Sequence, residues 1–324
     1  MEILEAKLIP VGGNWAIGFL EGPAPGQGDI LYFTNRSRDK SAQQFIQRID
    51  LKAPHKGVSF VYHGHAGGLW YRGGDIFATA TAKEGESGVI RFKAVDGKSN
   101  FGKPRNLVAG SVAGRELINP NDLVCDKHGG VYFTDKKGKA IYYIDRNGKT
   151  ILVTAYVDDG SRENDKPEEL GNPNGIILSP DGDVIYVTDN SNILYAPIAG
   201  PGKLGTELRH LLQGNGITEP SYYEIAGITP KPGKKGKPGW TAKYGGNMNI
   251  DGMTVDADGV VYGAALSTGI VFGWDGKTGE LKRVIKCPGG AVNCVIAGAD
   301  RNTLCVVGSF GLARVRLPVS AGFE

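Results

Sequence analysis

Short runs of apolar, β-favouring residues alternate with polar turns along this chain. The clearest stretch contains four such runs, at residues 123–125, 131–135, 140–145 and 150–153. The turns between them contain Gly, Asn, Asp and Lys, which are residues typical of tight turns between antiparallel strands. This pattern predicts a four-stranded antiparallel sheet.

The same order of strand, turn and strand recurs along the rest of the sequence. The further runs are 31–35, 69–71 with 76–78, 176–178 with 184–189, 253–255 with 260–263, and 295–297 with 303–307. No apolar run of about 20 residues, the length of a membrane-spanning helix, interrupts them. The pattern therefore indicates an all-β protein built from a repeated unit.

A five-residue phrase opens each of the six units. The phrases are Phe19-Leu20-Glu21-Gly22-Pro23, His65-Ala66-Gly67-Gly68-Leu69, Asn119-Pro120-Asn121-Asp122-Leu123, Asn172-Pro173-Asn174-Gly175-Ile176, Asn249-Ile250-Asp251-Gly252-Met253 and Ala291-Val292-Asn293-Cys294-Val295. Their third residues are separated by 46, 54, 53, 77 and 42 residues. A period of roughly 40–50 residues is typical of a four-stranded propeller blade. We predict a six-bladed β-propeller that forms one domain over residues 1–324, with the segment near residues 7–10 completing the last blade.

The third residues of the phrases, called the third positions below, would meet at one end of the central channel. Four of them offer oxygen ligands: Glu21, Asn121, Asn174 and Asp251. Each residue alone is an ordinary turn former, so the prediction depends on their occurring at one point of the repeat. Oxygen donors of this kind favour Ca²⁺, with Mg²⁺, Mn²⁺ or Zn²⁺ as alternatives. We predict one divalent cation in the channel, with open positions for water and substrate.

The longest spacing contains an insertion, residues 214–249, with a basic run at 231–239. A long loop in a compact domain is usually functional or disordered. Two interpretations stay open, a lid whose Tyr222 and Trp240 contact the substrate, or a solvated loop kept soluble by its lysines. Because the insertion leads directly into the Asp251 phrase, we expect it over the metal end of the channel.

Composition narrows the classes of function. The formal charge is only +3, and Lys and Arg are not interleaved with aromatic residues, so a nucleic-acid partner is not expected. The four cysteines form no C-x-x-C pair, and Cys125 and Cys305 lie in apolar runs where buried thiols are expected. The N-terminal residues lack the pattern of a signal peptide. We predict a monomeric cytoplasmic protein without a membrane partner, or a periplasmic or secreted one if a leader has been removed.

The phrases, with the strands that follow them, resemble the senescence-marker-protein, gluconolactonase and luciferin-regenerating-enzyme family, to which diisopropyl fluorophosphatase is related in fold and site. The resemblance extends over residues 18–317. It implies a six-bladed propeller, one catalytic divalent metal, often Ca²⁺, and hydrolysis of sugar lactones or related esters. Glu21, Asn174 and Asp251 match the family's metal ligands, and Asn121 matches an Asn that binds metal or substrate. Three features depart from the family: Asn119 replaces a common Arg, Gly67 replaces a common Asn, and the insertion is longer.

The hypothesis for function is therefore a metal-dependent lactonase. The metal would hold the lactone carbonyl oxygen, and Asp251 would either activate water or attack as a nucleophile. Asp122 would orient substrate hydroxyls or cap its own turn. The remaining predicted substrate contacts are Asn119, His65, Asn293, Tyr222 and Trp240.

Two alternatives remain from the sequence. The first is a phosphotriesterase or another ester hydrolase that uses the same site. The second is a non-catalytic propeller that binds a partner and holds no metal. A metal-free lyase of the strictosidine-synthase kind is disfavoured, because it would have no use for the full set of ligands.

Overall fold

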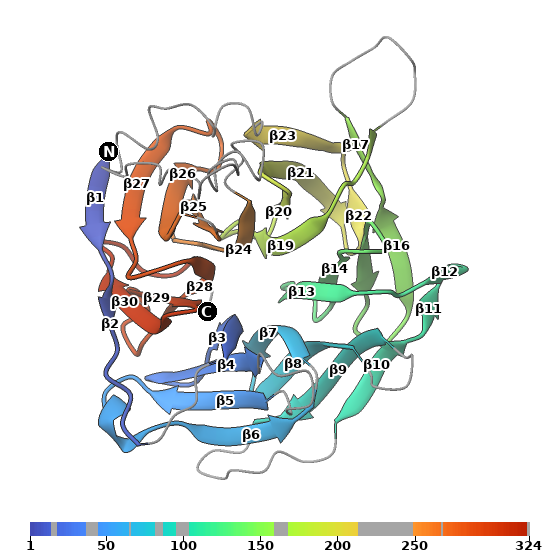
Figure 1. Ribbon diagram of the computed structural model, residues 1–324. Helices are drawn as coiled ribbons and strands as arrows, with labels where there is room; N and C mark the ends of the chain where they lie inside the picture. Colours follow the sequence, from blue (N-terminus) through green and yellow to red (C-terminus); the bar gives the residue numbers. More distant parts are fainter. Residues whose placement is uncertain are drawn as a thin grey trace, which may run out of the picture.

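The computed structural model describes residues 1–13, 18–36, 45–64, 66–81, 87–94, 104–158, 168–212, 249–266 and 268–322. Within these ranges the protein is all β apart from one 3-10 turn at Pro54–Lys56. The sheets surround a central channel in a propeller-like fold (Figure 1). No helix in the described ranges is long and apolar enough to cross a bilayer.

The described residues form six sheets of four or more strands, numbered here along the chain. Sheet one contains β3 (Phe19–Pro25), β4 (Ile30–Arg36), β5 (Phe45–Asp50) and β6 (Ser59–His63). Sheet two contains β7 (Ala66–Arg72), β8 (Asp75–Thr81), β9 (Ser87–Lys93) and β10 (Arg105–Ala109). Sheet three contains β13 (Pro120–Cys125), β14 (Val131–Asp135), β15 (Ala140–Ile144) and β16 (Thr150–Thr154). A small hairpin, β11 (Ser111–Val112) with β12 (Arg115–Glu116), precedes sheet three.

Sheet four contains β19 (Pro173–Leu178), β20 (Val184–Asp189), β21 (Asn192–Gly200) and β23 (Leu208–Leu212), with short additions from β17 (Tyr156–Asp158), β18 (Glu168–Glu169) and β22 (Lys203–Leu204). Sheet five contains β24 (Ile250–Val255), β25 (Val260–Ala265), β26 (Ile270–Asp275) and β27 (Leu281–Lys286). Sheet six contains β28 (Ala291–Ala297), β29 (Thr303–Gly308) and β30 (Gly311–Arg316).

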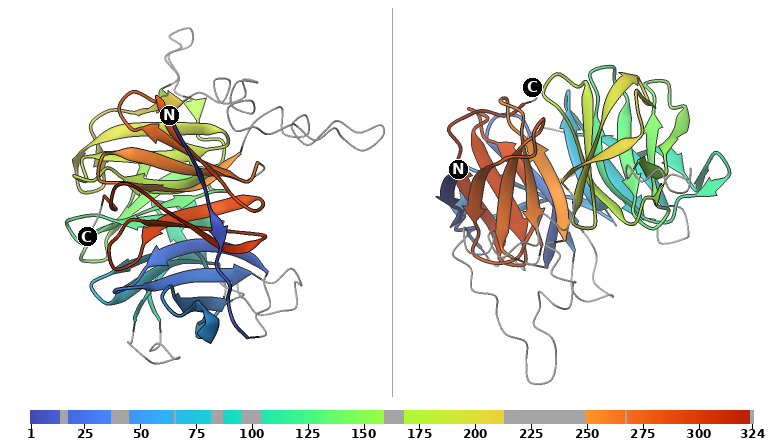
Figure 2. Two further views of the ribbon diagram at one scale, coloured as in Figure 1. Left: turned by 90° about the vertical axis from the view of Figure 1, so that its left-hand side faces the viewer. Right: turned by 90° about the horizontal axis from the view of Figure 1, so that it is seen from above.

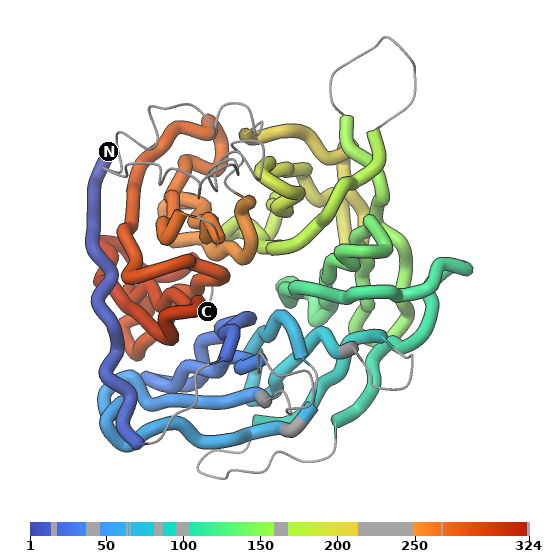
Figure 3. The backbone as a smooth tube through the Cα atoms, in the orientation of Figure 1, coloured from blue at the N-terminus to red at the C-terminus, as the bar shows by residue number. Residues whose placement is uncertain are grey.

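The N-terminal segment ties the last two sheets together. β1 (Glu2–Glu5) pairs in parallel with β27 of sheet five, and β2 (Lys7–Leu8) pairs antiparallel with β30 of sheet six. The segment therefore runs along the outer edge of both sheets, as the blue end of the tube shows (Figure 3). The prediction that this segment completes the last sheet is confirmed, and the parallel pairing with sheet five is additional. The pairing covers two outer edges that would otherwise be open to aggregation.

The core lies between neighbouring sheets, which are stacked around the ring (Figure 2). Apolar side chains from facing sheets pack together, as Tyr132 and Ile141 of sheet three do with Ile177 and Tyr186 of sheet four. A strand that is buried on both faces needs apolar residues at every position. This burial explains the short blocks of apolar residues in the sequence. All four cysteines are unpaired, and Cys125 and Cys305 are buried, as predicted.

The innermost strand of every sheet contains a break in its pairing register within the repeated phrase. These breaks lie between Glu21 and Ala24, Ala66 and Leu69, Pro120 and Leu123, Pro173 and Ile176, Ile250 and Met253, and Ala291 and Asn293. A bulge puts extra residues opposite one partner residue and turns their side chains away from the regular ladder. The bulge is thus the local structure encoded by the repeated phrase.

A threonine hydroxyl holds the bulge of the next sheet in four of the six sheets. The bonds run from Oγ1 to a main-chain oxygen: Thr34 to Gly67 (3.2 Å), Thr79 to Asn121 (2.7 Å), Thr134 to Asn174 (2.7 Å) and Thr188 to Asp251 (2.9 Å). Pairing places Ala264 and Val307 at the equivalent points of sheets five and six. The hydroxyl satisfies a carbonyl that the bulge leaves without a ladder partner, and it fixes one sheet against the next.

We expect Thr188→Val to destabilise the protein by about 1–3 kcal/mol, because the buried carbonyl of Asp251 loses its donor while side-chain volume is conserved. Urea unfolding followed by tryptophan fluorescence measures the change. Thr150→Val, on the outer strand β16, is the matched control and should change stability by less than about 0.5 kcal/mol. Equal effects for the two variants would contradict a role for the hydroxyl between sheets.

Candidate functional site

The structure brings the predicted oxygen ligands to one end of the channel. Glu21, Asn174 and Asp251 are buried, with relative exposures of 6%, 3% and 6%, and Asn121 is half-buried. The Asn174 side chain hydrogen-bonds to the Asp251 carboxylate. The charge of Asp251 also acts on Glu21, and their two strands lie on either side of sheet six. Residues far apart in sequence therefore share one polar cluster.

The pairing of β28 corrects the position of Asn293 in the repeat. Asn293 was assigned to the third position, but it pairs with Val307, and Ala291 pairs with Gly308. The bulge of β28 has only one unpaired residue, so Val292 occupies the third position. Asn293 takes the following position, called the fourth position here, which Asp122 fills in sheet three. The sixth unit therefore contributes no oxygen ligand at the third position.

Asp122 and Asn293 join opposite sides of the ring. The Nδ2 atom of Asn293 donates to Oδ2 of Asp122 at 3.3 Å, and Oδ1 of Asp122 accepts from the backbone N–H of Leu123 at 3.0 Å. Asp122 thus caps its own bulge, which is one of the two roles predicted for it. Contact with substrate hydroxyls stays a prediction.

Glycine occupies the fourth position of the other four sheets, and two of these glycines make room for this bond. A Cβ atom on Gly68 would fall 2.0 Å from Oδ1 of Asp122, and one on Gly252 would fall 1.8 Å from Cγ of Asn293. Gly22 has the positive φ of 47° that L residues rarely adopt. The fourth-position glycines Gly68 and Gly252 therefore have a steric purpose, which the turn-former interpretation alone does not give them.

Burial and mutual repulsion raise the pKa values of the carboxyl groups in the cluster. Burial, followed by the charge of Asp251, raises the pKa of Glu21 to about 8. Burial raises the pKa of Asp122 to about 7, and burial also raises the pKa of Asp251. Each shift reports that the ionised form lacks compensation in the protein alone. Such shifts are common at functional sites.

Two cations beside the cluster were missed by the sequence analysis. Arg36 acts on Glu21, Asp122 and Asp251, and Lys136 acts on Glu21 and Asp251; both lower the carboxyl pKa values against the effect of burial. Each residue lies two positions after a threonine that holds a bulge, Thr34 or Thr134. An alignment of the second strands, in addition to the phrases, would have found both.

The other predicted contacts have different outcomes. Asn119 is half-buried directly before β13. Its N–H donates to Oδ1 of Asp135 at 2.8 Å, and its carbonyl accepts from the N–H of Lys136 at 2.9 Å. His65, Tyr222 and Trp240 lie outside the described residues, as does the predicted insertion 214–249 except Asn249. Their predicted roles stay predictions.

The described residues contain no group of three His, Cys, Asp or Glu side chains arranged to hold a metal. The predicted set has a different composition, with two carboxylates and two amides. The donor chemistry is that of hard cations such as Ca²⁺, which accept carboxylate and amide oxygens.

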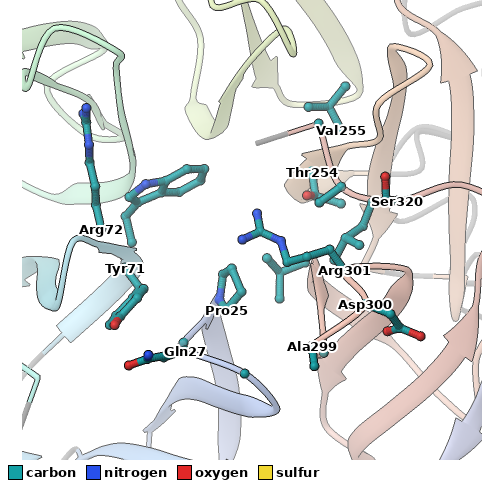
Figure 4. A pocket seen from close by; sticks show the side chains of 18 of the residues that line it. Pro25, Gln27, Tyr71, Arg72, Thr254, Val255, Ala299, Asp300, Arg301 and Ser320 are labelled. Atoms are coloured by element: carbon teal, nitrogen blue, oxygen red, sulfur yellow. The ribbon is translucent and has the colours of Figure 1, made fainter. Parts of the chain in front are cut away.

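A separate cavity lies at the other end of the channel, where the inner strands finish (Figure 4). It has a volume of about 760 Å³ and is lined by residues such as Pro25, Trp70, Val255, Ile296 and Arg301. The third-position residues lie near the start of each inner strand, whereas the residues that line the cavity lie at the end of the inner strands or after them. The strand length therefore separates this cavity from the polar cluster.

Comparisons with known proteins agree with this architecture. The family described as "SMP-30/Gluconolactonase/LRE-like region" matches residues 43–202 and 225–309. A gluconolactonase from Xanthomonas campestris is 20% identical, with 93% of this chain and 87% of that chain covered and a TM-score of 0.63. Regucalcin from Agrobacterium tumefaciens, described as a calcium-binding protein, is 15% identical, with 100% and 98% covered and a TM-score of 0.66.

A luciferin-regenerating enzyme is 14% identical, with 94% of each chain covered and a TM-score of 0.63. No curated protein matches the chain. At these identities the solved structures establish the fold, and the family match, which extends over more than half of the chain, establishes the family. The chain belongs to the SMP-30/gluconolactonase/LRE-like family.

Proposed function

We propose that this protein is a divalent-metal-dependent hydrolase that opens lactones, built as a single six-bladed propeller in which each of the six sheets is one blade. The observation that carries the proposal is the convergence of Glu21, Asn174 and Asp251 in one buried cluster. Family membership and the gluconolactonase among the structural neighbours support the lactone as the substrate class.

The residues of the cluster fit a divalent cation. Glu21 and Asp251 are buried carboxylates whose pKa values are raised by desolvation, so they lack a positive partner strong enough to keep both ionised. A divalent ion held by these carboxylates, with the amide oxygens of Asn121 and Asn174, would supply that charge. The calcium-binding description of the regucalcin neighbour supports Ca²⁺ as the ion. When bound, the ion would supply Lewis-acid polarisation of the substrate carbonyl.

Asp251 is the residue placed to move the proton. Its carboxylate is buried and oriented by the hydrogen bond from Asn174. As a base it takes a proton from water while the water oxygen bonds to the carbonyl carbon. The ring carbon–oxygen bond then breaks, and the proton passes to the ring oxygen, so lactone and water become one hydroxy acid. Direct attack by the same carboxylate, followed by hydrolysis, gives the same product.

The same residues would serve a phosphotriester or another ester, and the substrate panel below separates these classes. A binding module without catalysis is the less economical alternative, because carboxylates with raised pKa values are costly to bury and would serve no purpose there. We further propose a monomeric protein that acts on a small molecule in the cytoplasm, or in the periplasm or outside the cell if a leader has been removed.

Catalytic activity should depend on a bound divalent cation and on Asp251. Protein stripped with EDTA and reloaded with Ca²⁺, Mg²⁺, Mn²⁺ or Zn²⁺ should hydrolyse members of a panel of aldonolactones, aromatic lactones and phosphotriesters. Asp251→Asn should lower kcat by about 10²–10⁴-fold, because the general base is lost while side-chain volume is kept. Proton release measures turnover, and Asp258→Asn, on an exposed turn, is the control. Activity that survives EDTA, or that survives loss of Asp251, would sink the proposal.

The stability of the metal-free protein should depend on pH. In metal-free protein the carboxyl pKa values of Glu21 (about 8) and Asp122 (about 7) lie above those of the unfolded chain, so the folded state binds more protons at intermediate pH. Stability should therefore fall as pH rises from about 5 to 8, by up to about 1.4 kcal/mol per pH unit for each group.

Urea unfolding across this pH range with EDTA measures the slope, and Asp122→Asn should reduce it. Saturating Ca²⁺ should flatten it, because a bound cation favours the ionised carboxylates. A slope that is the same with EDTA and with Ca²⁺ would show that no cation binds these groups.

A further inference from the structure

We propose that Arg36 binds a carboxylate on the substrate, so that the lactones or esters taken by this site carry an acidic group. The inference rests on the proposed function and adds the substrate class to it. Arg36 is the last residue of β4 and is half-buried. It follows Thr34 by two residues, so the two side chains leave the strand on the same face. Thr34 donates to the carbonyl of Gly67 on sheet two.

Arg36 occupies the space where sheet two would have a third-position side chain. Its Nη2 atom lies 3.1 Å from the point where a Cβ of Gly67 would be. Glu21, Asn121, Asn174 and Asp251 present oxygen atoms at the corresponding positions of their sheets. Because Gly67 has no side chain, sheet one supplies a guanidinium to this part of the ring instead. The ring thus has a cation at a point where the repeat would otherwise place an oxygen ligand.

The charge of the guanidinium acts on the carboxylates, but within the described part of the chain no ion pair joins them. The charge of Arg36 lowers the pKa values of Glu21, Asp122 and Asp251. Its Nε atom is buried and has no hydrogen-bond partner among the described residues. A buried N–H donor without a partner costs folding free energy. Beside a predicted substrate site, such a donor is available to bind a substrate acceptor. Nε and Nη2 share the edge of the guanidinium that binds a carboxylate with two parallel bonds.

The charge of the whole cluster agrees with an anionic substrate. Glu21, Asp122 and Asp251 carry three negative charges when ionised, and Arg36 and Lys136 carry two positive charges. With a divalent ion bound, the cluster has one positive charge in excess. An acidic group on the substrate would remove that excess, whereas a neutral sugar lactone would not.

The test compares two substrates that differ in one charge, 5-oxotetrahydrofuran-2-carboxylate and the 2-carboxamide of the same ring. For Ca²⁺-loaded wild-type protein we expect kcat/KM to be at least about tenfold higher for the carboxylate, with the difference in KM. Arg36→Gln should abolish this preference, and Arg36→Lys, which keeps the charge without the planar fork, should keep part of it. Arg316→Gln, an exposed arginine paired with Asp300, is the matched control and should keep all of it.

A binding measurement separates this inference from the hydrolase proposal. Calorimetry of succinate, succinamate and inorganic phosphate with Ca²⁺-loaded protein needs no turnover. Succinate should bind to the wild-type protein at least about tenfold more tightly than succinamate does. The two compounds should bind to Arg36→Gln with equal affinity. That result supports the role of Arg36 even if no lactone is hydrolysed. The inference would be overturned if Arg36→Gln, with the melting temperature and calcium content of the wild type, still preferred succinate to succinamate. The carboxylate assignment would be overturned if phosphate bound more tightly than succinate and this binding depended on Arg36.

Discussion

Each inner strand leaves its ladder at the channel end, for two residues in sheets one to five and for one residue in sheet six, and the rest of the site depends on this interruption. A regular strand would alternate its side chains between the two neighbouring sheets, whereas the bulge turns one residue of each sheet toward its counterparts. The interruption leaves main-chain groups without ladder partners. The threonines at 34, 79, 134 and 188 provide the donors, each from the preceding sheet. Each hydroxyl therefore satisfies the backbone and fixes neighbouring sheets, and three of the four bond to the carbonyl of a predicted ligand, Asn121, Asn174 or Asp251.

The electrostatics of the cluster oppose stability. Three carboxyl groups are buried close together, and burial is the largest cause of every shift in their pKa values. Replacing such groups by apolar residues would usually be neutral or stabilising, so their presence calls for a ligand rather than for a structural explanation. Asn174 and the cations Arg36 and Lys136 offset only part of the cost. A divalent ion is the simplest group that would offset the remainder at this donor set.

The sequence was informative where the repeat was regular. The blocks of apolar residues located the strands, and the third and fourth residues of the phrase are the unpaired residues of the bulge in sheets two to five. In sheet one the unpaired residues are Gly22 and Pro23, and Glu21 pairs with Thr34. The sixth phrase was misaligned by one residue, since the bulge of β28 is shorter and Val292 resembles a strand residue rather than a ligand. Arg36 and Lys136 were missed because they belong to the second strands, outside the phrase. Contacts that depend on the fold rather than on the repeat, such as the bond between Asp122 and Asn293, leave no local signal in the sequence.

Gly67 shows how one departure from a repeat changes the chemistry of the whole ring. Any side chain at this position would crowd the main-chain oxygen of Asn121, 2.7 Å from its Cβ, and the guanidinium of Arg36. The glycine therefore leaves room for the cation beside the ring, and the main-chain oxygen of Asn121 and the hydroxyl of Thr79 leave no room for a larger residue. Because the carboxylates come from sheets one, three and five while Arg36 reaches toward sheet two, the charges around the channel are asymmetric. An asymmetric ring can fix the orientation of a substrate as well as bind it, since a molecule with its acidic group toward sheet two would present a defined carbonyl to Asp251.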